Sequence, residues 1–155
     1  MLEKTITKAF EMATARNWQK IFVAIDIHDT VVVSNYSGNK IPTVFYPNAK
    51  EVLQYLSSRQ DVVLIMFTSS HPHEMQKYEE FFESQNIHFK FINENPDCPS
   101  TGYGCYDRKF YFNVLIEDKA GFDAENGWAE VMQEFQKHPT LNPTGPLIVE
   151  MKERL

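Results

Sequence analysis

Residues 24–32 read AIDIHDTVV, an apolar run that changes abruptly to acidic and polar residues and then becomes apolar again. The hydrophobic residues at its start are typical of the interior of a sheet, whereas carboxylates avoid burial unless another group pairs with them. We therefore expect a buried strand over residues 21–27, with Asp26, His28 and Asp29 at its end. A cation is the first partner to consider for acidic side chains in such a place.

Two later apolar runs also end in polar residues. Residues 62–67 are apolar throughout and are followed by Thr68, and residues 110–118 end in Glu117 and Asp118. Unbroken apolar runs of this length, bounded by polar residues, are typical of strands that are buried on both faces.

Helical patterns separate these strands. Strands that alternate with amphipathic helices indicate a parallel sheet with helices on both faces, so the sequence predicts an α/β protein with a three-layer α/β/α, Rossmann-like fold and a mainly parallel sheet. Pro72 suits the first turn of one helix. The predicted helices cover residues 4–17, 49–59, 72–85 and 124–138, and a further short strand covers residues 87–93.

Three segments have less decisive patterns. Residues 31–33 either continue as a second extended piece or fold over the site as a flap. Residues 93–108 form a long loop rich in Pro, Gly and Ser, and loops of this length in compact domains are often functional. Residues 147–149 could add an edge strand.

Length and composition indicate one soluble domain over residues 1–155, with an N-terminal helical extension (1–18) and a C-terminal tail (139–155). The formal net charge of −6 argues against a broad nucleic-acid or anionic membrane surface. The N-terminal 20 residues match neither a signal peptide nor a membrane span, so a cytoplasmic location is expected. The two cysteines, Cys98 and Cys105, are expected to be reduced thiols.

The ends of the three strands are expected to form one site. In open parallel α/β sheets, ligands bind at the carboxyl ends of the strands, where Asp26, Thr68 and Asp118 should converge. Together with Lys109, these residues supply a carboxylate nucleophile, a hydroxyl donor, a cation and a metal-binding carboxylate. Taken singly, each has an ordinary explanation as a cap, a turn residue or a solvated lysine.

In this order the residues resemble the motifs of the haloacid dehalogenase-like superfamily, phosphotransferases with an aspartate nucleophile. The motifs read DIHDT at 26–30, FTSS at 67–70, RK at 108–109 and IED at 116–118. INENP at 92–96 also resembles a small branch of phosphatase-like proteins in that superfamily. The resemblance implies a haloacid dehalogenase-like fold, and the short segment between the first two motifs leaves no room for a sizeable cap domain.

The resemblance also implies the chemistry. Asp26 would attack phosphorus and form an acyl phosphate, which is a known form of covalent catalysis. Because both reactants are anionic, Mg²⁺ would neutralise the charge, held by Asp26, Asp118 and the backbone carbonyl of His28, with Glu117 as a further carboxylate at the metal. Lys109 would balance the charge of the transferring group. Thr68, Ser69 and the amides that open the next helix would bind the phosphate oxygens.

His28 is a departure, because the family has its acid/base aspartate at this position. An imidazole can perform both proton transfers, so His28 is a candidate catalytic residue. Its presence also leaves open a degenerate relative that binds metal and a phosphorylated ligand with little turnover. A receiver-like phospho-acceptor domain is a third interpretation, although the motif order weighs against it. The expected partner is a small phosphorylated substrate or the phosphorylated end of a larger molecule.

Overall fold

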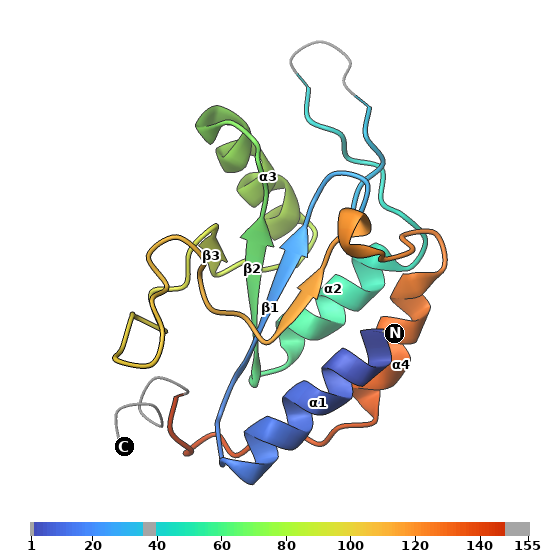
Figure 1. Ribbon diagram of the computed structural model, residues 1–155. Helices are drawn as coiled ribbons and strands as arrows, with labels where there is room; N and C mark the ends of the chain where they lie inside the picture. The colour runs from blue at the N-terminus through green and yellow to red at the C-terminus, as the bar shows by residue number, and fades with distance from the viewer. Residues whose placement is uncertain (1, 36–39, 148–155) are drawn as a thin grey trace.

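The computed structural model describes residues 2–35 and 40–147. Its centre is a sheet in which every pairing is parallel and the strand order is β3-β2-β1-β4 (Figure 1). The described strands are β1 (Ile21–Asp26), β2 (Val62–Phe67), β3 (Phe91–Ile92) and β4 (Val114–Ile116).

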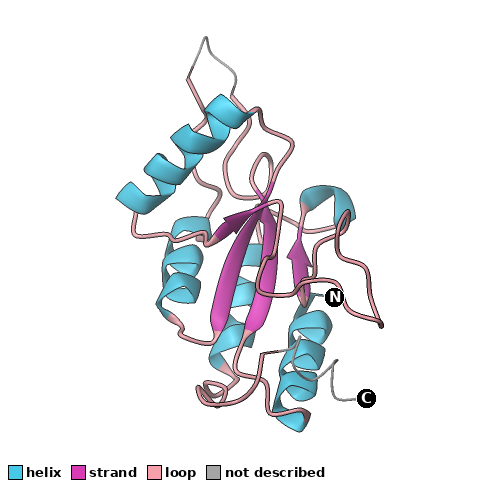
Figure 2. Ribbon diagram, turned by 90° about the vertical axis from the view of Figure 1, so that its left-hand side faces the viewer, coloured by secondary structure: helices cyan, strands magenta, loops and turns pink. Residues whose placement is uncertain are grey.

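Helices lie on both sides of these strands (Figure 2), which confirms the three-layer α/β/α, Rossmann-like fold expected from the sequence. Helix α4 packs against both α1 and α2, and α1 also contacts β1 and β4. The described helices are α1 (Leu2–Ala15), α2 (Ala49–Ser58), α3 (Pro72–Ser84) and α4 (Gly127–Gln136), with a 3-10 turn η1 at Asp118–Ala120.

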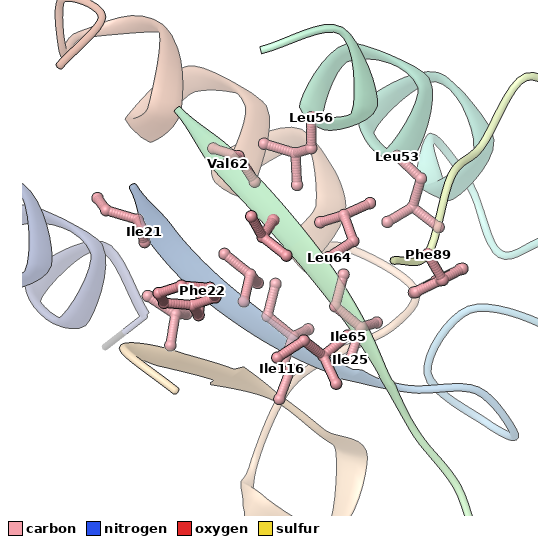
Figure 3. Packing of buried hydrophobic residues seen from close by; sticks show 14 of the residues in the cluster. Ile21, Phe22, Ile25, Leu53, Leu56, Val62, Leu64, Ile65, Phe89 and Ile116 are labelled. Atoms are coloured by element: carbon pink, nitrogen blue, oxygen red, sulfur yellow. The ribbon is translucent and has the colours of Figure 1, made fainter. Parts of the chain in front are cut away.

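The hydrophobic pattern accounts for these elements. All residues of β1 before Asp26 are fully buried, as is expected for a central parallel strand. Helix α2 turns one apolar face toward the sheet. Leu53 and Leu56 come from that face and lie near Val62 and Leu64 of β2 (Figure 3).

The N-terminal helix belongs to the same core. Ile6 and Phe10 of α1 are buried, and Phe10 packs edge-on against Phe135 of α4 with the ring centroids 5.7 Å apart. The segment predicted as an extension is therefore packed on the sheet within one hydrophobic cluster. None of the helices within residues 2–35 and 40–147 combines the length and the apolarity that a membrane crossing needs.

A buried ion pair lies at the end of the sheet where the strands begin. Two guanidinium nitrogens of Arg59 donate to the two carboxylate oxygens of Asp61 at 2.8 and 2.7 Å, and the side chains are 7% and 1% exposed. Arg59 also donates to the backbone carbonyls of Phe135 and His138, and Asp61 accepts the N–H of Leu141. One pair of side chains thus connects α2, β2 and the chain that follows α4.

Two strands are shorter than predicted. The side-chain carbonyl of Asn113 accepts the N–H of Phe22 at 2.8 Å, in place of a backbone carbonyl, so regular pairing begins only at Val114. At the other edge, β3 begins only at Phe91 although the sequence predicts the strand from residue 87, and Asn93 ends it one residue early in a left-handed conformation (φ 53°). Side-chain and backbone geometry, rather than hydrophobicity, thus set the start of β4 and the end of β3.

Residues 31–33 leave the sheet. The N–H of Val33 donates to the carbonyl of Val44 at 2.8 Å, and the N–H of Tyr46 donates to the carbonyl of Val31 at 2.9 Å. Through this antiparallel contact residues 31–33 form a second extended piece above the carboxyl ends of the strands (Figure 1). None of these three residues lines the pocket beside the strand ends. Residues 148 and 149 of the predicted edge strand lie outside the described residues.

Candidate active site

Three carboxylates meet where β1 and β4 end. Asp26 is the last residue of β1, and Glu117 and Asp118 directly follow β4, the neighbouring strand. One oxygen from each of the three side chains lies within 4.8 Å of the other two, and all three residues are half-buried. The parallel sheet therefore brings together residues that are about 90 positions apart in the chain.

Thr30 holds two of these carboxylates in place. Its hydroxyl donates to Asp26 Oδ2 at 2.8 Å and accepts the backbone N–H of Asp118 at 3.0 Å. The side chain is fully buried, and the Thr30 carbonyl accepts the indole N–H of Trp128 at 2.9 Å. Because Asp29 adopts a left-handed conformation (φ 60°), the chain turns back and brings the Thr30 hydroxyl toward Asp26.

The three carboxylates shift one another's pKa values. Burial, together with the negative charges of Glu117 and Asp118, raises the pKa of Asp26 to about 7, although the Thr30 hydrogen bond opposes this shift. Burial likewise raises the pKa of Glu117. Hydrogen bonds with Glu117, Asp26 and Thr30 lower the pKa of Asp118 and outweigh its burial.

A divalent cation fits this donor set. Three carboxylate oxygens in such proximity repel one another, and this repulsion adds to burial in raising the pKa of Asp26. Protein-bound Mg²⁺ usually takes oxygen ligands from one or two carboxylates and keeps several waters. Asp26, Glu117 and Asp118 are therefore the residues that could hold Mg²⁺.

A pocket of about 590 Å³ opens beside the carboxylates. Its size falls within the range of small-molecule sites. It is lined by acidic, hydroxyl, cationic and aromatic side chains, namely Asp26, His28, Asp29, Phe67, Thr68, Ser69, Asn93, Arg108, Phe110, Glu117, Asp118 and Lys119.

The predicted phosphate-binding residues lie in this pocket. Thr68 and Ser69 directly follow β2, next to Asp26 at the end of β1. The side-chain amide of Asn93 donates to the Thr68 carbonyl at 2.6 Å and accepts the Thr68 N–H at 2.9 Å, so both polar groups of the Thr68 backbone are fixed. The Thr68 hydroxyl is hydrogen-bonded to the Ser70 hydroxyl at 2.7 Å.

Helix α3 begins after these residues. The N–H of His71 donates to Glu74 Oε1 at 3.1 Å, and Pro72 occupies the first turn as predicted. Thr68 is therefore not the residue that caps the helix.

His28 lines the pocket but also contacts α3. Its Nε2 lies 2.5 Å from the hydroxyl of Tyr78, a fully buried residue of α3, and the proton can come from either partner. Burial lowers the pKa of His28, against the opposing effect of Glu74 and Asp29. The imidazole is thus held between the pocket and α3.

The predicted lysine lies elsewhere. The Lys109 ammonium sits over the ring of Phe112, 5.8 Å from its centroid, and Lys109 is not among the residues that line the pocket. Arg108 and Lys119 are the cations that line it instead. The structure therefore brings together all the predicted site residues except Lys109.

Sequence reasoning does not assign Thr30, Asn93, Arg108 or Lys119 to the site. Thr30 ends the DIHDT motif and Asn93 lies in INENP, so both motifs contain a usable signal. Arg108 precedes Lys109, and no residue pattern distinguishes which of two adjacent cations faces a pocket. Outside the site, Cys98 is buried, Cys105 is exposed, and neither forms a disulfide.

No family model matches the sequence, and no curated protein matches it. A solved structure does match, that of a conserved protein from Bacteroides thetaiotaomicron. The TM-score is 0.59 at 20% sequence identity, and the match covers 76% of this chain and 91% of that chain. At this identity the likeness establishes a shared fold.

Proposed function

We propose that this protein is a Mg²⁺-dependent phosphohydrolase of the haloacid dehalogenase-like type that hydrolyses a phosphomonoester. The observation that carries the proposal is the approach of Asp26, Glu117 and Asp118 to within 4.8 Å at the carboxyl ends of adjacent strands. Hydroxyl and cationic side chains line the adjoining pocket, as a phosphate-binding site requires.

In this proposal Asp26 is the nucleophile. A carboxylate oxygen of Asp26 attacks phosphorus, the bond between phosphorus and the leaving oxygen breaks, and an acyl phosphate forms on Asp26. Water then attacks the same phosphorus and releases inorganic phosphate, which restores the Asp26 carboxylate. Bound Mg²⁺ would supply the positive charge that offsets the anionic nucleophile and substrate.

Other residues assist these two steps. The hydroxyl of Thr30 fixes the orientation of Asp26 through its 2.8 Å hydrogen bond. Arg108 and Lys119 place positive charge along the pocket, where the phosphate would lie. His28 is the candidate for protonating the leaving oxygen and for accepting the proton of the attacking water.

The test is hydrolysis of 4-nitrophenyl phosphate by the purified protein with Mg²⁺. We expect turnover that a chelator abolishes and that added Mg²⁺ restores. Asp26→Asn should abolish turnover while circular dichroism shows an unchanged fold, because the amide keeps the volume but cannot attack phosphorus. Turnover by this variant at the wild-type rate would exclude Asp26 as the nucleophile.

A binding protein with little turnover is the second candidate. The hydrogen bond between His28 and Tyr78 favours it, because it engages a nitrogen that an acid/base residue would use. Mg²⁺-dependent binding of inorganic phosphate without hydrolysis of any phosphomonoester would support this candidate. A stable acyl phosphate after treatment with a small phosphodonor would instead favour a receiver-like domain.

A further inference from the structure

An exposed phenyl ring stands next to the proposed nucleophile. Phe67 is the last residue of β2, and its side chain is 36% exposed although every other residue of that strand is buried. The exposed large hydrophobic residues in the described chain are Val33, Val44, Phe67 and Tyr103, and of these only Phe67 lines the pocket. Aromatic side chains are common on the walls of small-molecule sites, so the position of this ring in the pocket points to a role in binding.

The register of the sheet fixes the position of this ring relative to the carboxylates. Phe67 pairs with Asp26 across the parallel β1 and β2 strands. Paired residues of neighbouring strands lie about 5 Å apart, and their side chains leave the same face of the sheet. A group bonded to a phosphate at Asp26 would therefore lie within reach of the Phe67 ring.

A second ring supports the first from the loop after β3. The centroids of Phe67 and Phe110 are 6.1 Å apart, with the planes tilted by 59°, and Phe110 also lines the pocket. Phe110 is 9% exposed, and its centroid lies 5.7 Å from that of Phe112. These distances are typical of stabilising aromatic pairs. Phe67 and Phe110 thus form an aromatic wall in a pocket whose other lining residues are polar or charged.

We infer that this aromatic wall binds the leaving group, so that the preferred substrates are small phosphomonoesters with an aromatic ring attached directly, or through one carbon, to the phosphate oxygen. This inference rests on the proposed function. Because Phe67 and Asp26 are paired across the strands, the aromatic ring of the substrate must lie close to its phosphorus in order to reach Phe67. A flat ring can pack against Phe67, whereas a short alkyl group leaves Phe67 exposed to water.

The test compares three substrates whose leaving groups are all primary alcohols. Benzyl phosphate, cyclohexylmethyl phosphate and ethyl phosphate differ mainly in the group that would meet the aromatic wall. We expect kcat/KM to be at least about tenfold higher for benzyl than for ethyl phosphate, since hydrophobic pockets discriminate by about this factor. The kcat/KM of cyclohexylmethyl phosphate should fall between these two values, because its ring is apolar but not flat.

Substitutions assign the preference to Phe67. Phe67→Ala should reduce the benzyl-to-ethyl ratio to about 3 or less, and Phe67→Leu should lower the benzyl-to-cyclohexylmethyl ratio in particular. Tyr103→Ala is the matched control, because Tyr103 is an exposed aromatic residue of the same loop as Phe110 and does not line the pocket. It should leave both ratios unchanged.

Binding measurements distinguish a failure of the proposed function from a failure of the inference about the aromatic wall. Benzylphosphonate and ethylphosphonate cannot be hydrolysed, and calorimetry with Mg²⁺ measures their affinity even if no substrate turns over. Absence of all turnover, with a Phe67-dependent preference for benzylphosphonate, would overturn the proposed function and leave the aromatic wall in place. Equal kcat/KM values for the three phosphates, or a benzyl preference that survives Phe67→Ala, would overturn this inference alone.

Discussion

The hydroxyl of Thr30 lies 2.8 Å from Asp26 Oδ2, which makes the last residue of the DIHDT motif the support of its first. The same hydroxyl accepts the N–H of Asp118 from the adjacent strand end at 3.0 Å. A single buried side chain thus fixes the spacing between the proposed nucleophile and a proposed metal ligand.

Replacing Thr30 should therefore damage both stability and activity. Thr30→Val keeps the shape but leaves the Asp118 N–H without its acceptor, so we expect a loss of about 1–3 kcal/mol in the free energy of unfolding. Turnover should fall by about tenfold or more, because Asp26 loses its orientation. Thr30→Ser retains the hydroxyl and should keep most of the stability and most of the turnover. Urea unfolding and steady-state kinetics provide the measurements, and a valine variant with wild-type turnover would contradict this role.

The proposed metal ligands should differ in importance. Asp118→Ala should raise the Mg²⁺ concentration for half-maximal activity by about tenfold or more, because few protein oxygens hold the ion. Glu117→Gln should have a smaller effect, because Glu117 Oε1 already accepts the N–H of Lys119 at 2.9 Å in the η1 turn. Titration of activity with Mg²⁺ measures both. Unchanged metal dependence in Asp118→Ala would transfer the ligand role to Glu117.

Variants of His28 and of its partner Tyr78 distinguish a catalytic role of the histidine from a structural one. If His28 is the acid/base residue, His28→Asn should lower turnover by about 10²-fold. Tyr78→Phe removes the hydroxyl without changing the volume of a fully buried residue, and it should alter kcat more than KM because it frees the imidazole. Thermal unfolding of both variants controls for stability. Near wild-type kcat in His28→Asn would leave the histidine a structural role only.

Glu134 should contribute a pH-dependent part of the stability. Its carboxylate accepts the Thr7 hydroxyl at 2.5 Å and pairs with Lys137 and His138, and these contacts lower its pKa to about 2 from the ordinary 4.5. A lowered native pKa stabilises the fold above about pH 4.5, and this contribution is lost as the pH falls toward about 2.

We therefore expect Glu134→Gln to lower the urea midpoint at pH 7 and to approach the wild-type midpoint as the pH decreases from 4.5 toward 2. Glu130→Gln, an exposed position on the same helix, serves as the control and should show little difference at any pH. A constant difference between Glu134→Gln and the wild type across this range would show that the carboxylate charge is not responsible.

The hydrophobic pattern of the sequence predicts the central strands and, through their ends, part of the candidate site. The apolar run of residues 62–67 coincides with the observed bounds of β2, because the burial of its first five residues is visible in local composition. Since strand ends in a parallel sheet meet at one edge, the sequence alone places Asp26, Thr68 and Asp118 together, and all three line the pocket.

Loop conformation accounts for what the sequence does not predict. Lys109 is expected at the site, yet its ammonium lies over Phe112 while Arg108 lines the pocket, because the path of the loop decides which of two adjacent cations turns inward. Phe67 belongs by its pattern to the apolar core of its strand, and its exposure depends on how the loop containing Phe110 passes the strand end. Both outcomes depend on contacts between residues far apart in the sequence.

The ion pair of Arg59 and Asp61 lies at the end of the sheet opposite the three carboxylates, where it connects α2, β2 and the chain that follows α4. Removing one partner of such a buried pair leaves an uncompensated charge in the interior. Degradation in the cell responds to the unfolded fraction, so inherited variation at Arg59 would act through protein abundance. Replacing Arg59 should therefore lower the amount of folded protein in the cell, whereas the molecules that remain folded would keep the geometry of the distant carboxylates.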